Sequence, residues 1–154
     1  MKSPLRSKAS RAFNIPTRQN LYSITKTLSF CYGHRLMNHP GKCRHLHGHS
    51  ARVSITLKSE QLNNQGMVCD FSDIKQFAGQ WIDDTFDHNM LLHKDDPILA
   101  SLQQAGERVM VVDEHPTAEF LAKMIFDYVA GGGFPVSNVS VWETDSANAS
   151  YSGS

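Results

Sequence analysis

CRHLHGHSARVSITLK, residues 43–58, is the stretch of sequence that decides the fold. Its apolar residues over 51–57 alternate with polar ones, which is the period of two expected of a half-buried β-strand. Extended backward, this period places His47 and His49 on one face, and Gly48 leaves the other face clear. Residues two apart on a strand lie about 6.5–7 Å apart, so both imidazoles can reach one metal ion. The alternative is that His-Gly-His is only a polar entry to the strand.

A second strand is predicted just upstream, from Tyr22 to His34. Almost all of its apolar residues share one parity, and serine and threonine fill the other. His34 falls on the apolar face, where a buried imidazole needs a partner. Turn formers at 38–41 predict a hairpin that brings His34 beside His47 and His49. Three imidazoles leave the fourth tetrahedral position of zinc open, as in catalytic sites, although His34 alone is more often a satisfied core histidine.

Two amphipathic helices are predicted further along the chain. Ser72 is the expected N-cap of the first helix, and Thr117 is the expected N-cap of the second, which three glycines terminate. Between them, residues 93–108 are interpreted as an insertion over the core with a short helix. Short strands are predicted over 109–112 and 138–143, with a last strand near the C-terminus. This order predicts an α+β domain whose antiparallel sheet carries two main helices on one face.

Composition favours one soluble domain with a modest core, since 40% of the 154 residues are hydrophobic and 19% are charged. Residues 1–19 are basic and lack acids, which predicts a flexible N-terminal extension before a single catalytic domain over 20–154. A weak likeness to an organelle transit peptide is the alternative. No apolar run is long enough for a membrane span, and no basic, aromatic-rich surface indicates nucleic-acid binding. Three cysteines, an odd number, favour reduced thiols and a cytoplasmic location.

Two acidic positions are candidate functional groups. Asp87 precedes His88 in a predicted loop, and a carboxylate beside an imidazole can fix its tautomer for acid–base catalysis. Such a pair by itself more often lies on a solvated surface. Glu143 continues the apolar row of Val139 and Val141, where a carboxylate is unfavourable unless something binds it. A ligand, a basic partner or an exposed strand end would each explain this position.

Five motifs, taken in order, resemble the 6-pyruvoyl-tetrahydropterin synthase family over about residues 22–151. They are Phe30-Cys31-Tyr32-Gly33-His34-Arg35-Leu36, Cys43-x-x-x-His47-Gly48-His49, Asp87-His88, Pro116-Thr117-Ala118-Glu119 and Trp142-Glu143-Thr144. The spacing between the cysteine and His-Gly-His is most similar to the 6-carboxytetrahydropterin synthase branch, which belongs to queuosine biosynthesis. Asn89 and Leu92 depart from the family pattern and leave the detail of the proton relay open. Four histidines match no family ligand and are interpreted as surface residues: His39, His45, His93 and His115.

The resemblance implies a metal site and a proton relay. His34, His47 and His49 would hold zinc as the cofactor. Cys43 would accept a proton, and Asp87-His88 would supply its relay partners. Cys43 suits this role because a thiolate near a metal ion is a competent base at neutral pH.

The resemblance also implies the substrate and the assembly. Glu143 would anchor the pterin ring, with Thr117 and Glu119 near the same pocket, because a carboxylate can accept two parallel hydrogen bonds from the pterin edge. The enzyme would be a lyase that converts 7,8-dihydroneopterin triphosphate to 6-carboxy-5,6,7,8-tetrahydropterin, triphosphate and acetaldehyde. It would adopt the tunnelling fold and form a homohexamer of two stacked trimers, an oligomeric barrel with active sites at subunit interfaces.

Two other functions remain open at this point. The same fold could make 6-pyruvoyl-tetrahydropterin, and analysis of the product separates the two activities. The protein could instead be a non-catalytic zinc-binding assembly protein, in which case Cys43→Ala would leave the result of every activity assay unchanged. A simple zinc hydrolase fits the three histidines but leaves Cys43 and Glu143 without a role.

Overall fold

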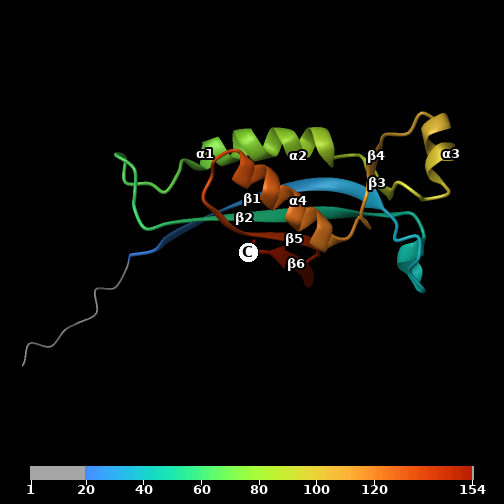
Figure 1. Ribbon diagram of the computed structural model, residues 1–154, viewed down its shortest axis with the longest axis horizontal. Coiled ribbons are helices and arrows are strands. Elements are labelled where there is room, and N and C mark those ends of the chain that lie inside the picture. The colour runs from blue at the N-terminus through green and yellow to red at the C-terminus, as the bar shows by residue number, and fades with distance from the viewer. Residues whose placement is uncertain (1–19, 154) are drawn as a thin grey trace, which may run out of the picture.

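The computed structural model describes residues 20–153, and the predicted N-terminal extension, residues 1–19, lies outside them. The strands form one sheet in the order β4-β3-β1-β2-β5-β6. Their bounds are β1 (Tyr22–His34), β2 (His47–Ser59), β3 (Met90–His93), β4 (Val109–Val112), β5 (Val136–Thr144) and β6 (Ala147–Tyr151). The main helices lie over one face of this sheet (Figure 1).

The first predicted helix is a continuous helical segment with a π-helical turn in its middle. Its parts are α1 (Phe71–Ile74), η2 (Lys75–Gly79) and α2 (Gln80–Thr85). The prediction that Ser72 is its N-cap is wrong, because the carboxylate of Asp70 takes that place and accepts a hydrogen bond from the Ser72 backbone N–H at 2.8 Å. Asp70 stands before the first helical residue, whereas Ser72 is already inside the helix.

The second predicted helix is α4 (Ala118–Gly131), and its predicted N-cap is confirmed. Thr117 Oγ1 accepts a hydrogen bond from the backbone N–H of Phe120 at 3.2 Å. Two short helices complete the described chain: η1 (Lys42–Arg44) and α3 (Leu99–Gln104). Every helix among the described residues is too short or too polar to span a bilayer.

The predicted hairpin of β1 and β2 is confirmed. The two strands are antiparallel along their full lengths, and their register pairs His34 with His47 and Tyr32 with His49. β2 also pairs antiparallel with β5, and β5 with β6. Because side chains alternate along a strand, the register sets all three histidines on the face that the helices cover.

Part of the sheet differs from the antiparallel arrangement that the sequence predicts. β3 was not expected, and it runs parallel to both β1 and β4. The helical segment from α1 to α2 runs in the same direction as β1 and ends near the last residues of β1. The chain then enters β3 from that end, so β3 runs parallel to β1. Four residues are too few for a clear period of two. α3 buries no residue and lies beside β4, so the expected position of residues 93–108 over the core is wrong (Figure 1).

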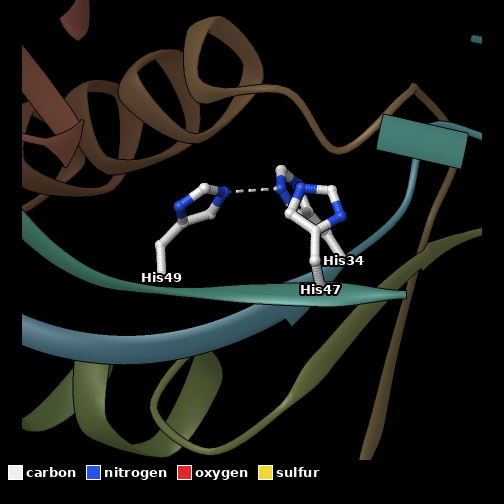
Figure 2. A group of neighbouring side chains, drawn as sticks. All are labelled: His34, His47 and His49. Carbon is white, nitrogen blue, oxygen red and sulfur yellow. Dashed lines mark hydrogen bonds between the residues drawn. The ribbon is translucent and has the colours of Figure 1, made fainter. Parts of the chain in front are cut away.

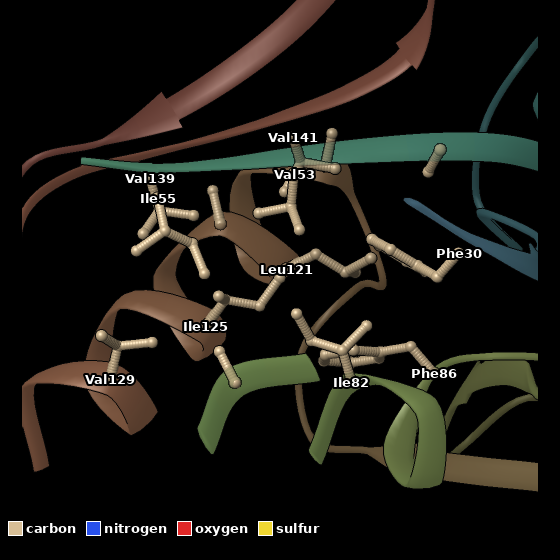
Figure 3. Packing of buried hydrophobic residues seen from close by; sticks show 14 of the residues in the cluster. Phe30, Val53, Ile55, Ile82, Phe86, Leu121, Ile125, Val129, Val139 and Val141 are labelled. Carbon is tan, nitrogen blue, oxygen red and sulfur yellow. The ribbon is translucent and has the colours of Figure 1, made fainter. Parts of the chain in front are cut away.

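The hydrophobic core fills the space between the sheet and the main helices (Figure 3). It joins side chains from β2 and β5 to side chains from α4 and the end of α2, among them Val53, Ile55, Ile82, Phe86, Leu121, Ile125, Val139 and Val141. Each fully buried side chain of this size stabilises the fold by roughly 1.5–3 kcal/mol. Since His47 and His49 continue the row of Val53 and Ile55 along β2, the packing of the core fixes the direction of both imidazoles.

Candidate functional site

Three histidines converge at the end of the β1–β2 hairpin (Figure 2). Their potential ligand nitrogens all lie within 4.8 Å of one another. The Nε2 atoms of His34 and His49 are 3.2 Å apart. In a tetrahedral zinc site with Zn–N bonds of about 2.0–2.1 Å, donor atoms lie roughly 3.4 Å apart. This donor set therefore fits a metal ion.

Two backbone carbonyls fix the tautomers of these rings. Nδ1 of His34 donates to the carbonyl oxygen of Pro116 at 2.7 Å, and Nδ1 of His47 donates to that of His45 at 2.7 Å. Because a carbonyl oxygen can only accept, each of these two rings carries a hydrogen on Nδ1, which leaves Nε2 as the nitrogen that can bind a metal. Burial lowers the pKa of His34 below its ordinary value, which favours the neutral form that binds metal. Pro116 has this role through its backbone, so no sequence signal could have identified it.

One cavity of about 380 Å³ brings together all of the predicted site residues except Asp87 and His88. Its walls include His34, His47, His49, Cys43, Thr117, Glu119 and Glu143. Cys43 lies in η1, is half-buried, and is held through its backbone carbonyl, which accepts a hydrogen bond from Leu36 N–H at 2.8 Å. A thiol, two carboxylates and a metal-binding trio therefore face one small space.

Glu143 lies near the end of β5, but its side chain is half-buried and has a partner. Its Oε1 accepts a hydrogen bond of 2.6 Å from the Tyr32 hydroxyl, and lies 3.7 Å from Nε2 of His34 and 3.9 Å from Nε2 of His49. Burial raises the pKa of Tyr32 well above its ordinary value, and the hydrogen bond to Glu143 raises it further, so the phenol stays protonated and donates. Sequence reasoning assigned no role to Tyr32. The available signal was its parity, which places it on the face of His34.

Asp87 and His88 form a separate arrangement. Asp87 Oδ1 accepts from the Cys31 backbone N–H at 2.7 Å, and Asp87 Oδ2 accepts from His88 Nδ1 at 2.6 Å. The hydrogen bond from the Cys31 N–H lowers the pKa of Asp87 most, and the hydrogen bond from His88 lowers it further. The His88 ring is 73% exposed and lines a different cavity, of about 510 Å³, together with Cys31 and Ser50. His47 and His49 also line this cavity, at the end of the hairpin, but its Cys31 and Ser50 have the opposite parity and lie on the other side of the hairpin.

The remaining histidines mostly lie where the sequence predicts. His39, His45 and His115 are exposed. The expectation for His93 is wrong, because its ring is half-buried and stacks on that of His115 with centroids 5.1 Å apart. A strand at 90–93 was not expected, so the partial burial that this strand imposes could not be foreseen.

A buried ion pair follows the first metal-binding residue along the chain. Arg35 donates from Nε to Asp96 Oδ2 at 2.7 Å and makes a second contact from Nη2 to Oδ1. The Asp96 side chain is fully buried. Burial by itself would raise the pKa of Asp96, but the hydrogen bonds from Arg35 and from the Ile98 N–H outweigh it, and the pKa is lowered. This pair ties the loop after β3 to the end of β1, and the sequence analysis did not find it.

The mixed sheet, its one-sided helices and the three converging imidazoles define an α+β protein with a candidate metal site. The chain belongs to the 6-pyruvoyl tetrahydropterin synthase family, whose model matches residues 23–154. It is 35% identical over 131 residues to the 6-carboxy-5,6,7,8-tetrahydropterin synthase of Rickettsia felis, covering 80% of this chain and 95% of that one. It is 29% identical over 139 residues to the synthase of the same name from Haemophilus influenzae, covering 85% and 99%.

Solved structures resemble the whole described fold. An uncharacterized protein from Wolinella succinogenes aligns with a TM-score of 0.74 at 27% identity, over 87% of this chain and 99% of that one. The 6-pyruvoyl tetrahydropterin synthase of Caenorhabditis elegans aligns with a TM-score of 0.66 at 22% identity, over 89% and 99%. The predicted α+β tunnelling fold is therefore confirmed.

Proposed function

We propose that this protein converts 7,8-dihydroneopterin triphosphate and water to 6-carboxy-5,6,7,8-tetrahydropterin, triphosphate and acetaldehyde, a step of queuosine biosynthesis in the cytoplasm. The observation that carries the proposal is one cavity that holds three imidazoles, a thiol and the carboxylate of Glu143. The names of the relatives from Rickettsia felis and Haemophilus influenzae support it, and three free cysteines are in keeping with the location.

The metal in this proposal is zinc, held by His34, His47 and His49. Imidazole nitrogens are ordinary zinc ligands, and three of them leave one position for the substrate. When bound, the ion polarises the substrate's side-chain hydroxyls and stabilises the negative charge that develops beside them.

The chain's own residues bind the substrate and move the proton. Glu143 accepts hydrogen bonds from the amino group and ring N–H of the pterin, as it would from a guanidinium. Thr117 and Glu119 lie at the same cavity wall beside the start of α4, and we assign them to the pterin pocket. Cys43 accepts the proton from the side-chain carbon, and such proton transfer typically contributes ~10²–10⁴-fold to the rate.

Asp87 and His88 complete the relay in this proposal from a neighbouring subunit of a homohexamer. Two features support this arrangement. The pair is already ordered by the Cys31 backbone and stays exposed, whereas Cys43 opens into a cavity that neither residue lines. The outer edges of β4 and β6 pair with no strand in residues 20–153, so further sheets can join there.

The test is incubation of zinc-loaded protein with 7,8-dihydroneopterin triphosphate, with products identified by mass spectrometry. The expected products are 6-carboxy-5,6,7,8-tetrahydropterin and acetaldehyde. Cys43→Ala should abolish both, whereas the matched control Cys69→Ala should not, because Cys69 lies outside the cavity. Full activity of Cys43→Ala would contradict the proposed base.

A second candidate is 6-pyruvoyl-tetrahydropterin synthase activity, which the description of the matching family favours. The same experiment separates the two, because a pyruvoyl product without acetaldehyde would replace the first proposal by the second. No turnover by folded, zinc-loaded protein would instead favour a non-catalytic zinc-binding protein.

The shared active site is tested by mixing inactive variants. Cys43→Ala and His88→Ala each lack one half of the relay, and a refolded equal mixture should regain about a quarter of the wild-type activity if the halves come from different subunits. The control is a mixture of Cys43→Ala with His47→Ala, in which both changes fall within one cavity. No recovery beyond that control would contradict the intersubunit relay.

A further inference from the structure

We propose that Tyr32 is the positioning residue of Glu143, whose carboxylate it holds ready for the substrate and keeps from entering the metal site as a fourth ligand. The claim that Tyr32 positions Glu143 for the substrate rests on the proposed function. The claim that Tyr32 keeps Glu143 away from the metal concerns only the metal site and can be tested without enzymatic turnover.

The phenol of Tyr32 is held firmly in place. The residue is 3% exposed, and its ring packs edge-on against His34, with centroids 5.0 Å apart, and at a tilt against His49, with centroids 5.7 Å apart. Both of these neighbours belong to the metal-binding trio. A ring fixed on two sides gives its hydroxyl one direction, and the hydroxyl meets Glu143 Oε1 at 2.6 Å.

The carboxylate of Glu143 lies at the border of the metal site. Its Oε1 is 3.7 Å from Nε2 of His34 and 3.9 Å from Nε2 of His49. Donor atoms of a tetrahedral zinc site lie roughly 3.4 Å apart, so Oε1 is slightly beyond ligand spacing from two of the three histidines. It does not belong to the group of mutually close donor atoms that includes His47, so it would have to move to become a fourth ligand. A carboxylate is a regular zinc ligand, and a site with four protein ligands has no position left for a substrate.

The hydrogen bond from Tyr32 decides between these two states of Glu143. A phenol donating to a carboxylate forms a strong, charge-assisted bond, and it takes up electron density on the oxygen that faces the histidines. Among the described residues no other side chain donates to Glu143. Tyr32 does not line the cavity that Cys43 and Glu143 share, so it acts on the substrate through Glu143 and not by contact.

The variant that isolates the hydroxyl is Tyr32→Phe, which keeps the buried ring. With cobalt(II) in place of zinc, visible absorption reports the number and type of ligands. We expect the cobalt spectrum of Tyr32→Phe to differ from that of the wild type, because Glu143 joins the metal. The spectrum should return to the wild-type form in Tyr32→Phe/Glu143→Gln. The control is Tyr22→Phe, which removes a hydroxyl at the other end of β1 and should leave the spectrum unchanged.

The kinetic test is a double-mutant cycle. Tyr32→Phe should lower kcat/KM roughly 10- to 100-fold, and Tyr32→Phe/Glu143→Gln should be no worse than Glu143→Gln alone, because the phenol acts through that carboxylate. Losses that multiply would mean that Tyr32 has an independent role and would overturn the proposal, as would a Tyr32→Phe spectrum identical to the wild type. If the wild type is inactive but the spectrum changes as expected, the proposed reaction fails and the role of Tyr32 at the metal stands.

Discussion

The end of the β1–β2 hairpin carries two different sites, one on each face. On the helix face, His34, His47 and His49 converge within one chain, and backbone carbonyls orient His34 and His47. On the other face, the Asp87–His88 pair is ordered by the backbone of Cys31 and remains exposed. The first site has three donors that fit a metal ion, whereas the second has an ordered carboxylate–imidazole pair beside a separate cavity. In the proposed function, metal binding falls to one face and proton transfer to the other, so a substitution on one face should remove one without the other.

The largest effect is expected for His34→Ala, which removes the most buried donor of the helix face. Two imidazoles cannot hold zinc in a tetrahedral site with useful affinity, so bound metal should be lost and turnover should fall by roughly 10³-fold or more. Metal content after dialysis, measured by atomic emission, and product formation check this. His45→Ala, which removes an exposed imidazole nearby, is the control. Retention of one zinc per chain in His34→Ala would contradict the assigned ligand set.

His88→Ala tests the other face and should separate the two sites. The metal content should equal that of the wild type, while kcat should fall about 10²-fold, the usual contribution of a general acid–base group. The corresponding measurements are atomic emission and steady-state kinetics, with His39→Ala as an exposed control. Loss of metal in His88→Ala would mean that the two faces are not independent.

Asp96→Asn is expected to change stability more than chemistry. It leaves Arg35 without its ion pair beside the end of β1, and because the Arg35 side chain keeps some contact with water the loss should be about 2 kcal/mol. Urea denaturation measures this free energy of unfolding. Asp95→Asn, next to it but largely exposed, should change it little.

The pH dependence of that stability has a defined sign. The pKa of Asp96 is lowered in the folded protein, so the ion pair contributes fully above the unfolded value of about 3.9 and is lost as the pH falls through the lower folded value. The difference in unfolding free energy between the wild type and Asp96→Asn should therefore be constant near neutral pH and shrink below about pH 4. A difference that grows on acidification would contradict this assignment.

The smallest effect is expected for Gly48→Ala, which changes the backbone between the two faces. A Cβ on Gly48 would lie 2.9 Å from the carbonyl oxygen of Tyr32, so the two strands must shift between the metal-binding residues. We expect metal affinity to fall about tenfold, as for other changes that disturb ligand orientation. Competition with a chelator measures it. Gly131→Ala, where an added Cβ meets nothing within 4 Å, is the matched control.

The local features of the fold could be read from the sequence. The hairpin, the helix-facing parity of His34, His47 and His49, and the N-cap at Thr117 were all predicted correctly. Each depends on residues close together in the chain, where a period of two or a capping residue is sufficient evidence. The likeness of the motifs to a known family supplied the function, which spacing by itself did not.

Features that depend on distant residues were missed or wrong. The pairing of β3 beside β1, the ion pair of Arg35 with Asp96, and the bond between Tyr32 and Glu143 each join residues far apart in the chain. Strand 90–93 has too few residues for a pattern, and nothing near Arg35 in the sequence indicates that Asp96 is its partner. The placement of α3 failed for the same reason, since no local signal tells which face a short helix covers.

The sequence by itself determined which residues face the helices, because side-chain direction follows from the backbone period along each strand. It thereby determined that His34, His47 and His49 share a face. Only the tertiary structure decided which tautomer His34 adopts, where Glu143 lies relative to the metal-binding nitrogens, and that His88 stands apart from Cys43. The physical reason is that these relations depend on distances of a few ångströms between chain segments that only the packed core brings together.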